Sequence, residues 1–336
     1  MTGETHITLA HGNGGRFMRE LIEEVVARAL GEAGPDTDLD AAPLELASGA
    51  TPMVTTDGFT VLPLEFPGGD IGSLAVNGTV NDLAVSGAVP KYLTCGFILE
   101  EGLDMAALER IVASFAAAAR AVPVEVVAGD TKVVPRGQGS GLYITTTGIG
   151  LRPDGVRLGM ALIRPGDAVL VSGTVGDHGV SVMLAREEFD LKGNVRSDCA
   201  AVTPLTLPLA TNPAVRFMRD PTRGGLATVA HEIARATGYE VCLSEPAIPV
   251  LESVRGVCDM LGYDPYYLAC EGRVVAVVAP EAAEEVLSIW RADENGAGAA
   301  RIGTIGEDGG RVRLETELGG TRYLEELEDD PLPRIC

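Results

Sequence analysis

Apolar and polar residues alternate along this chain with two different periods. In some segments apolar side chains recur every three or four residues, which is the period of a helix with one buried face. Elsewhere short apolar runs are bounded by Gly, Pro, Asp or Asn, as in buried strands. The first pattern predicts helices at residues 16–30, 73–87, 103–121, 177–188, 222–237 and 281–292. The second pattern predicts strands at residues 54–58, 92–99, 124–128, 142–150, 168–171, 239–243 and 272–278.

Helices and strands are interspersed over the whole chain, which predicts an α/β fold. At 336 residues the chain exceeds the usual size of one domain, and its 46% of hydrophobic residues suffices for two cores. A turn at residues 164–167 (RPGD) opens the second unit. We therefore expect an N-terminal domain over residues 1–160, a C-terminal domain over 161–326, and a flexible tail over 327–336.

The negative charge of the chain limits its partners. The formal net charge is -22, which repels nucleic-acid phosphates and anionic membranes, so we expect neither as a partner. No segment has the length and apolarity of a membrane span or the pattern of a signal peptide, so we expect a cytoplasmic protein. An anionic nucleotide would need metal ions or converging backbone N–H groups to bind.

The cysteine pattern points to one thiol. Six cysteines occur without a CxxC pair or a regular spacing, which argues against a zinc site and a disulfide framework. One of them, Cys336, is the last residue of a proline-stiffened segment at 331–336 (PLPRIC). A thiol placed there could be the tethered carrier of a reactive group, or an incidental surface cysteine. The tail alone leaves both interpretations open.

Four short segments place polar residues and glycines where packing does not require them. HGNGG at residues 11–15 precedes the predicted helix 16–30, where its N–H groups could bind an anion or simply start the helix. NGTVND at residues 77–82 puts Asp82 one helical turn from Gly78, which leaves room for a ligand beside the carboxylate.

The other two segments lie next to a predicted strand and a predicted helix. GDTK at residues 129–132 follows the strand 124–128, and ligands gather at the carboxyl ends of buried strands. A capped turn is the alternative there. RDPTRGG at residues 219–225 opens the helix 222–237, where Asp and Thr are also ordinary caps. Two arginines and two glycines favour an anion or a nucleotide at this place.

Carboxylates therefore stand at the ends of several predicted elements. Hard oxygen ligands of this kind suit Mg²⁺ that bridges nucleotide phosphates. The candidates are Asp57, Asp82, Asp130 and Asp220.

These segments, in this order, resemble the HypE family of hydrogenase-maturation carbamoyl dehydratases. That family belongs to the superfamily of aminoimidazole ribonucleotide synthetase and selenophosphate synthetase. The resemblance covers essentially the whole chain. Its most specific parts are residues 11–15, 77–84 (NGTVNDLA), 129–134 (GDTKVV), 218–225 (MRDPTRGG) and 334–336 (RIC).

The resemblance implies a homodimer of two-domain subunits with mixed sheets, in which the N-terminal domain forms the dimer interface and helps to build a cleft for ATP and Mg²⁺. It implies that a HypF-like carbamoyltransferase loads Cys336 with a carbamoyl group. The thiocarboxamide is then dehydrated to a thiocyanate, and the cyanide passes to iron on a HypC/HypD-like scaffold complex for a nickel–iron hydrogenase.

The resemblance also implies a role for each candidate residue. Cys336 carries the substrate, Glu271 removes the nitrogen protons, and Lys132 neutralises phosphate charge. An exposed carboxylate at the start of a strand is the alternative interpretation of Glu271. The expected Mg²⁺ ligands are Asp57, Asp82 and Asp220, with Asp130 as a further candidate. The expected ATP and phosphate contacts are Asn13, Gly14, Gly15, Asn81, Thr131 and Arg223.

Two other classes of function stay open at this point. The chain could be a kinase or ligase of the same superfamily that acts on a small free substrate, with Cys336 incidental. It could also be a non-catalytic partner whose tail docks on a maturation complex. Turnover of ATP that depends on Cys336 distinguishes the dehydratase from the kinase or ligase, and ATP hydrolysis of any kind argues against the docking partner.

Overall fold

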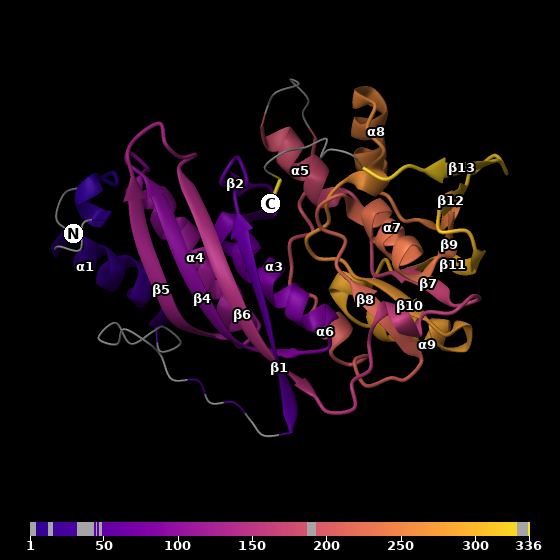
Figure 1. Ribbon diagram of the computed structural model, residues 1–336. Helices are drawn as coiled ribbons and strands as arrows, with labels where there is room; N and C mark the ends of the chain where they lie inside the picture. The colour runs from indigo at the N-terminus through magenta and orange to yellow at the C-terminus, as the bar shows by residue number, and fades with distance from the viewer. Residues whose placement is uncertain are drawn as a thin grey trace.

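A computed structural model shows two α/β domains that pack against each other (Figure 1). It describes residues 5–12, 16–31, 44, 46, 49–186, 193–327 and 335–336. The candidate anion-binding residues Asn13, Gly14 and Gly15 lie outside this part of the chain. None of the described helices is long and apolar enough to cross a membrane.

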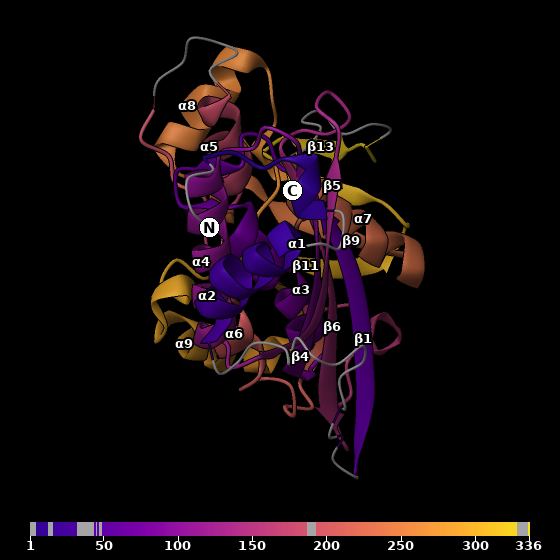
Figure 2. The ribbon, with the colours of Figure 1, turned by 90° about the vertical axis from the view of Figure 1, so that its left-hand side faces the viewer.

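The first domain is built on a four-stranded sheet with the order β1-β6-β4-β5. Strands β4 and β5 are parallel, and the other neighbours are antiparallel. Figure 2 shows helices α1 to α4 on the same side of this sheet. The strands are β1 (Ala50–Phe59), β4 (Val89–Glu100), β5 (Glu125–Val134) and β6 (Leu142–Pro153). The helical segments are α1 (Arg16–Leu21), η2 (Ile22–Ala27), α2 (Arg28–Leu30), α3 (Ile71–Val85) and α4 (Met105–Ala121).

The two faces of this sheet differ in exposure, as the alternation along β1 shows. Thr55 and Asp57 face α3, because each forms a hydrogen bond with a side chain of that helix. Val54 and Thr56 lie on the opposite face, and Val54 is 71% exposed. The face away from the helices therefore leaves an apolar side chain open. The dimer interface expected on this domain stays a prediction.

The second domain contains a seven-stranded sheet with the order β13-β12-β9-β11-β7-β10-β8. Only the pair β9 and β12 is parallel among the described strands of this sheet. The strands are β7 (Ala168–Val171), β8 (Val215–Arg219), β9 (Tyr239–Ser244), β10 (Val275–Val278), β11 (Ala300–Asp308), β12 (Val312–Glu315) and β13 (Thr321–Leu324). The helices are α5 (Asp177–Ala185), α6 (Thr203–Thr206), α7 (Gly225–Thr237), α8 (Glu252–Leu261) and α9 (Ala283–Arg291).

The two faces of this larger sheet are buried under different helices. Val169 and Val171 of β7 pack in the cluster that contains the apolar face of α7. Ala168 and Leu170 pack in the cluster around Trp290 of α9. A strand buried on both faces needs apolar residues at consecutive positions. This explains why the run at 168–171 has no polar member.

Helix α3 lies between the two domains. The carboxylate of Asp70 caps it by accepting hydrogen bonds from the N–H groups of Gly72 (2.7 Å) and Ser73 (2.9 Å). The helix packs on β1 and β6 and also contacts α6 and β8 of the second domain. A helix that is buried all round has little solvent face. Its polar residues, Asn81 and Asp82 among them, are therefore directed at other parts of the protein.

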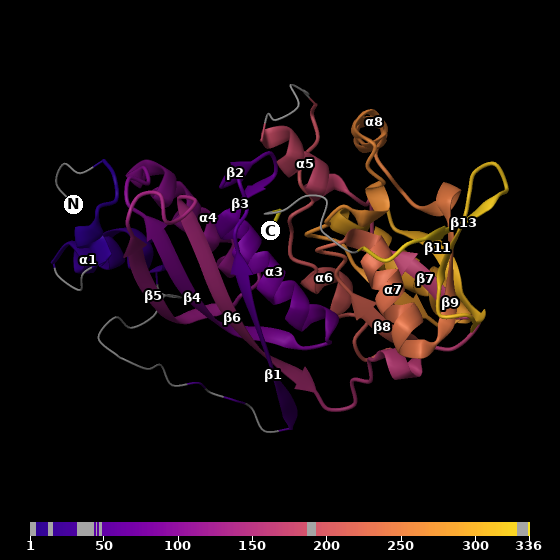
Figure 3. The same cartoon turned by 45° about the horizontal axis from the view of Figure 1, so that its top comes forward.

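The domains also share one hydrophobic cluster. Val180 of α5 and Val254 of α8 belong to the same cluster as the core of the first domain, and so does Ile335. Figure 3 shows α5 beside the small hairpin of the first domain, which consists of β2 (Glu65–Phe66) and β3 (Gly69–Asp70). The end of the chain is thus packed at the junction of the two domains.

Two predicted boundaries are wrong in ways that affect the site. Strand β5 continues to Val134, so residues 129–132 lie inside a strand that pairs with β4 and not beyond its end. Strand β10 begins at Val275, so Glu271 lies in the preceding loop and not at a strand start. Side-chain hydrogen bonds, rather than strand pairing, hold that loop. The sequence pattern also missed β8, β11, β12, β13 and α8.

Candidate active site

A small cavity lies between the two domains, and both of them line it. Its volume is about 150 Å³. Its walls come from β1, α3, the segment after β8, the loop before β10 and the end of the chain. The lining residues are Asp57, Gly58, Phe59, Gly78, Asp82, Asp220, Thr222, Arg223, Glu271 and Cys336.

Three of these side chains are aspartates from three different elements. Asp57 lies on β1, Asp82 on α3, and Asp220 directly after β8. The hydroxyl of Thr55 donates a hydrogen bond to Asp82 Oδ2 at 2.7 Å. The hydroxyl of Thr79 donates to Asp57 Oδ2 at 3.4 Å. The structure thus gathers three of the four carboxylates that the sequence offered as metal ligands.

Burial and mutual repulsion make these carboxylates hard to ionise together. Burial, followed by the charge of Asp82, raises the pKa of Asp57 to about 6. The same two causes, in the same order, raise the pKa of Asp220 to about 7. A cation would relieve this repulsion. In the part of the chain that the structure describes, however, no three His, Cys, Asp or Glu side chains could hold a metal ion by themselves.

Glu271 is the most strongly perturbed carboxyl group of the cavity. It is only 2% exposed, and its Oε1 atom has no hydrogen-bond partner among the described residues. Burial raises the pKa of Glu271 well above its usual range, and the charges of Asp198 and Asp220 add to the effect. Buried polar atoms are normally paired, so an unpaired oxygen that faces a cavity indicates a place for a ligand.

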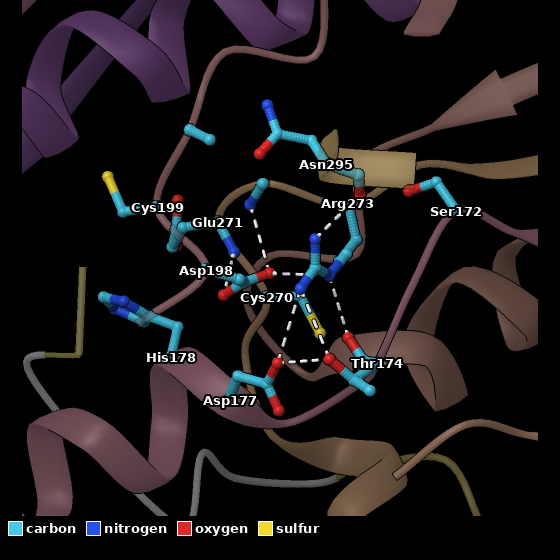
Figure 4. Close-up of polar contacts among 12 residues, drawn as sticks. Ser172, Thr174, Asp177, His178, Asp198, Cys199, Cys270, Glu271, Arg273 and Asn295 are labelled. Atoms are coloured by element: carbon cyan, nitrogen blue, oxygen red, sulfur yellow. Dashed lines mark hydrogen bonds and ion pairs between the residues drawn. The ribbon is translucent and has the colours of Figure 1, made fainter. Parts of the chain in front are cut away.

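The backbone around Glu271 is fixed by a second buried carboxylate. Asp198 Oδ1 accepts a hydrogen bond from the N–H of Glu271, and Asp198 Oδ2 accepts one from Gly272, both at 3.2 Å (Figure 4). A Cβ atom at Gly272 would collide with the backbone oxygen of Asp198. Glycine is therefore required for the close approach of the two loops.

Arg273 ties the same loop to other segments of the second domain. Its guanidinium group pairs with Asp198 (3.5 Å) and with Asp177 (3.4 Å), and it donates to the backbone oxygen of Thr174 (3.0 Å) (Figure 4). Such a network of buried charges is stable only when every member is paired. It makes the loop that carries Glu271 a rigid support.

The end of the chain is docked in this cavity. The backbone oxygen of Cys336 accepts hydrogen bonds from the N–H (3.2 Å) and the hydroxyl (3.3 Å) of Thr60. The Cys336 Sγ atom lies 3.5 Å from Arg223 Nη2. The side chain of Ile335 is 3% exposed. The thiol therefore faces the same small space as Glu271.

The amide of Asn81 is fully used in holding loops together. Its Nδ2 group donates to the backbone oxygens of Ala200 (3.0 Å) and Glu271 (3.2 Å). Its Oδ1 atom accepts from the N–H of Val202 at 2.8 Å. The structure thus adds a support function for Asn81, while its contact with ATP stays a prediction.

Three of the predicted residues lie away from the cavity, on β5. Thr131 is buried, whereas Asp130 and Lys132 are exposed and pair with each other at 2.9 Å. Strands β5 and β1 form opposite edges of the sheet. Asp57 faces α3. The side chain of Lys132 is 62% exposed, whereas its neighbour Thr131 is buried, so Lys132 lies on the opposite face of the sheet. Within one chain, Lys132 does not share a site with the acidic cluster.

The free space expected beside Gly78 is partly occupied. Gly78 and Asp82 do line the cavity together, as their spacing suggested. A Cβ atom at position 78, however, would come within 2.9 Å of the ring of Phe59. The missing side chain therefore makes room for an aromatic ring as well as for the cavity.

Sequence reasoning missed the residues that support the site. Thr60, His178, Ser197 and Asp198 belong to none of the motifs. Each acts on backbone groups or rings that are distant in sequence. Asp198 precedes Cys199 in a stretch without helical or strand period, and a polar residue in such a stretch is the only signal that could have pointed to it.

Two family models match this chain. The N-terminal domain of AIR synthase related proteins matches residues 38–152, and the C-terminal domain of the same family matches residues 164–315.

Individual relatives match over nearly the full length. Carbamoyl dehydratase HypE from Azotobacter vinelandii is 49% identical over 332 residues, covering 98% of this chain and 97% of the relative. The crystal structure of hydrogenase maturation protein HypE in complex with ATP has a TM-score of 0.93 and 45% identity, covering 98% of this chain and 99% of its own. The crystal structure of a HypE–HypF complex has a TM-score of 0.80 and 41% identity, covering 93% of this chain and 100% of the matched chain.

Asp220→Asn should stabilise the ligand-free protein near neutral pH. The fold raises the pKa of Asp220 from 3.8 to about 7, so the folded state binds more protons than the unfolded state between these values. Stability is therefore lost as pH rises through this window, and the variant escapes that loss. We expect a gain of about 1–3 kcal/mol in the free energy of unfolding above pH ~7, measured by urea unfolding.

The matched control for this measurement is Asp130→Asn, which changes an exposed carboxylate outside the cavity. Its stability should follow the wild-type dependence on pH. Equal pH dependences for Asp220→Asn and the wild type would contradict the raised pKa of Asp220.

Proposed function

The chain belongs to the HypE family of carbamoyl dehydratases, enzymes of hydrogenase maturation, and from this membership we propose its specific reaction. The family resemblance stated from the sequence is thereby confirmed. The proposed reaction is the ATP-dependent dehydration of a carbamoyl group carried as a thiocarboxamide on Cys336. The resulting thiocyanate supplies cyanide to the iron of a nickel–iron hydrogenase.

One observation carries the proposal. Cys336 lines the same cavity as Glu271 and the three aspartates, and its backbone is held there by Thr60. An incidental cysteine would have no reason to occupy a cavity with an unpaired buried carboxyl oxygen. The placement supports a carrier arm whose last atom is presented to a base.

The reaction needs two chemical steps on the carbamoyl group. The amide oxygen is a poor leaving group, so transfer of the γ-phosphoryl group of ATP to that oxygen converts it into phosphate and releases ADP. Loss of the nitrogen protons then forms the C≡N bond, and the C–O bond breaks to release inorganic phosphate. The protein has to position the groups and accept the protons.

Glu271 is the proposed proton acceptor. Burial makes its carboxylate a stronger base, because the neutral form is favoured in the cavity. Its Oε1 atom has no described partner, so it is available to a nitrogen proton. Its backbone N–H donates to Asp198 Oδ1 and its backbone oxygen accepts from Asn81 Nδ2, and these two hydrogen bonds keep it in place. Arg223, next to the Cys336 Sγ atom, is placed to neutralise charge on the phosphorylated intermediate.

The acidic cluster is suited to a cation that accompanies ATP. Asp57, Asp82 and Asp220 present like charges to one cavity, and the raised pKa values of Asp57 and Asp220 indicate a need for positive charge. Because these side chains do not form a complete site alone, phosphate oxygens are the natural remaining ligands. We propose that they hold Mg²⁺, which would neutralise phosphate charge when bound.

Lys132 fits this scheme only as a residue of a second subunit. It lies on the face of the first-domain sheet away from the helices, at the edge farthest from β1. The same face leaves Val54 exposed and is where we propose that two copies pair. A two-fold axis there would allow Asp130 and Lys132 of one copy to approach the nucleotide of the other.

Two further proteins are needed in this proposal. The related HypE–HypF complex supports a HypF-like carbamoyltransferase as the protein that loads Cys336. A scaffold complex that carries the iron, of the HypC/HypD kind, would receive the cyanide. Neither nucleic acid nor a membrane is part of the scheme.

The two alternative functions fit the cavity less well. A kinase or ligase for a small free substrate would find the cavity occupied by its own chain end. A pure docking module would not need a base whose burial is so unfavourable. We therefore favour the dehydratase.

Asp220→Asn should weaken the binding of Mg-ATP while it stabilises the ligand-free protein. The loss of one ligand charge lowers affinity for the cation on the order of tenfold or more, without a change in volume. Calorimetric titration with Mg-ATP measures this. Unchanged affinity in both Asp220→Asn and Asp82→Asn would remove these residues from the nucleotide site.

Subunit mixing tests the assignment of Lys132. Lys132→Ala and Asp220→Asn should each abolish nitrile formation alone. If Lys132 acts across the dimer, a mixed dimer contains one complete site and recovers up to about half of the wild-type activity. If Lys132 acts within its own chain, both sites of the mixed dimer are defective. Recovery is measured on purified doubly tagged dimers, and its absence refutes action across the interface.

Glu271→Gln and Cys336→Ser should fail at different stages. The Cys336→Ser chain accepts no carbamoyl group as a thiocarboxamide, whereas the Glu271→Gln chain is loaded but forms nitrile at least about a hundredfold more slowly. Intact-mass measurement before and after addition of ATP separates the two. Normal nitrile formation by either variant would overturn the proposed function.

A further inference from the structure

We propose that His178 is a positioning residue that latches the Cys336 arm into the cavity by donating a hydrogen bond to the backbone carbonyl of Ile335. The inference rests on the proposed function, in which Cys336 carries the carbamoyl group. No motif includes His178, and no step of the reaction uses it.

The imidazole of His178 is buried against Phe66, Ser197 and the end of the chain. It lies in α5 and is 0% exposed. Its Nε2 atom is 2.7 Å from the oxygen of Ile335, and its Nδ1 atom is 2.8 Å from the hydroxyl of Ser197. The ring also packs edge-on against Phe66, with 5.3 Å between centroids. Figure 4 shows the ring on the side of the site where Cys199 and Glu271 lie.

The two contacts of the ring determine which nitrogen carries the proton. A carbonyl oxygen can only accept, so the short contact with Ile335 requires a hydrogen on Nε2. Burial lowers the pKa of His178, which favours the neutral ring with one N–H. Nδ1 then accepts from the hydroxyl of Ser197. Ser197 therefore holds the tautomer that grips the arm.

Among the described residues, three anchors hold the last two residues of the arm, beside the contact of the Cys336 thiol with Arg223. His178 holds the carbonyl of Ile335, Thr60 holds the backbone oxygen of Cys336, and the Ile335 side chain fills the hydrophobic cluster shared by the domains. Two consecutive backbone oxygens are thus fixed by residues of different domains. A slip by one residue would lose both hydrogen bonds, so the anchors set the register of the thiol.

One loop aligns the latch with the proposed base. Ser197 contacts His178, and the next residue, Asp198, binds the N–H groups of Glu271 and Gly272. The same short segment therefore fixes both the position of the arm and the position of the base. This is why a docked thiol is presented to Glu271 in a fixed geometry.

Docking and loading make opposite demands on this latch. The docked Ile335 is buried, so the active site of another protein cannot surround the end of the arm until it leaves the cavity. The hydrogen bond from His178 favours dehydration, which occurs inside, and opposes loading, which occurs outside. Loss of the latch should therefore change the two steps in opposite directions. General damage to the fold would not have this signature.

Two substitutions separate the hydrogen bond from the volume of the ring. His178→Phe retains an aromatic ring against Phe66 but has no donor. His178→Gln places an amide N–H near the position of Nε2. Ser197→Ala leaves the donor but no longer fixes the tautomer, so it serves as a milder second variant.

Two rates are measured on the full-length protein. The first is alkylation of the Cys336 thiol by iodoacetamide, followed by peptide mass spectrometry with Cys336→Ser as the blank. The second is single-turnover nitrile formation from carbamoylated protein after addition of Mg-ATP. For His178→Phe we expect alkylation to rise and nitrile formation to fall, each on the order of tenfold, as for loss of one buried hydrogen bond. His178→Gln should lie near the wild type, and Ser197→Ala between.

The alkylation rate decides the latch independently of the reaction. Equal alkylation rates of the wild type and His178→Phe would overturn the latch. Equal alkylation rates of His178→Phe and His178→Gln would overturn it too. If the wild type itself forms no nitrile, the proposed function fails, whereas increased alkylation of His178→Phe would still support the latch.

Discussion

Repulsion among buried carboxylates is the constraint on which this site depends. Asp57, Asp82, Asp220 and Glu271 share one small cavity, and the protein has to hold them there against their mutual charge. An unpaired buried charge is unfavourable by several kcal/mol, so the surroundings must be rigid. They are rigid because α3 is packed between the domains and because Asp198 and Arg273 clamp the loop of Glu271. The fold thus keeps a negative pocket ready for positive charge.

The sequence predicted the fold where one period dominates a segment. The strand at 168–171 and the helix at 103–121 agree closely with β7 and α4, because the first is apolar throughout and the second has one buried face. Short strands such as β12 have too few residues to show a period. The polar end of β5 was also missed, because pairing with β4 continues past the last apolar residue. Such pairing depends on a neighbour that is distant in sequence.

The sequence predicted the reacting groups of the site but not the residues that hold them in place. Asp82, Asp220 and Cys336 stand in motifs, and the structure brings them together. His178 and Asp198 do not, because their function is to bind backbone groups of other segments, which leaves no local pattern. Lys132 shows the limit of a motif. The pairing of β4 with β5 contains a register shift, and this shift determines which side chains of β5 point to the face away from the helices. The motif does not reveal the shift.

The arm is held by interactions whose sum is close to the entropy that docking removes. Burial of Ile335 contributes about 2 kcal/mol, and the three hydrogen bonds from His178 and Thr60 contribute about 1 kcal/mol each. Ordering two residues with their side chains costs about 3–5 kcal/mol. Because the arm is tethered, little further entropy is lost on docking. A docked state near balance is what a carrier requires, since an arm that never leaves cannot be loaded and an arm that never docks cannot meet Glu271.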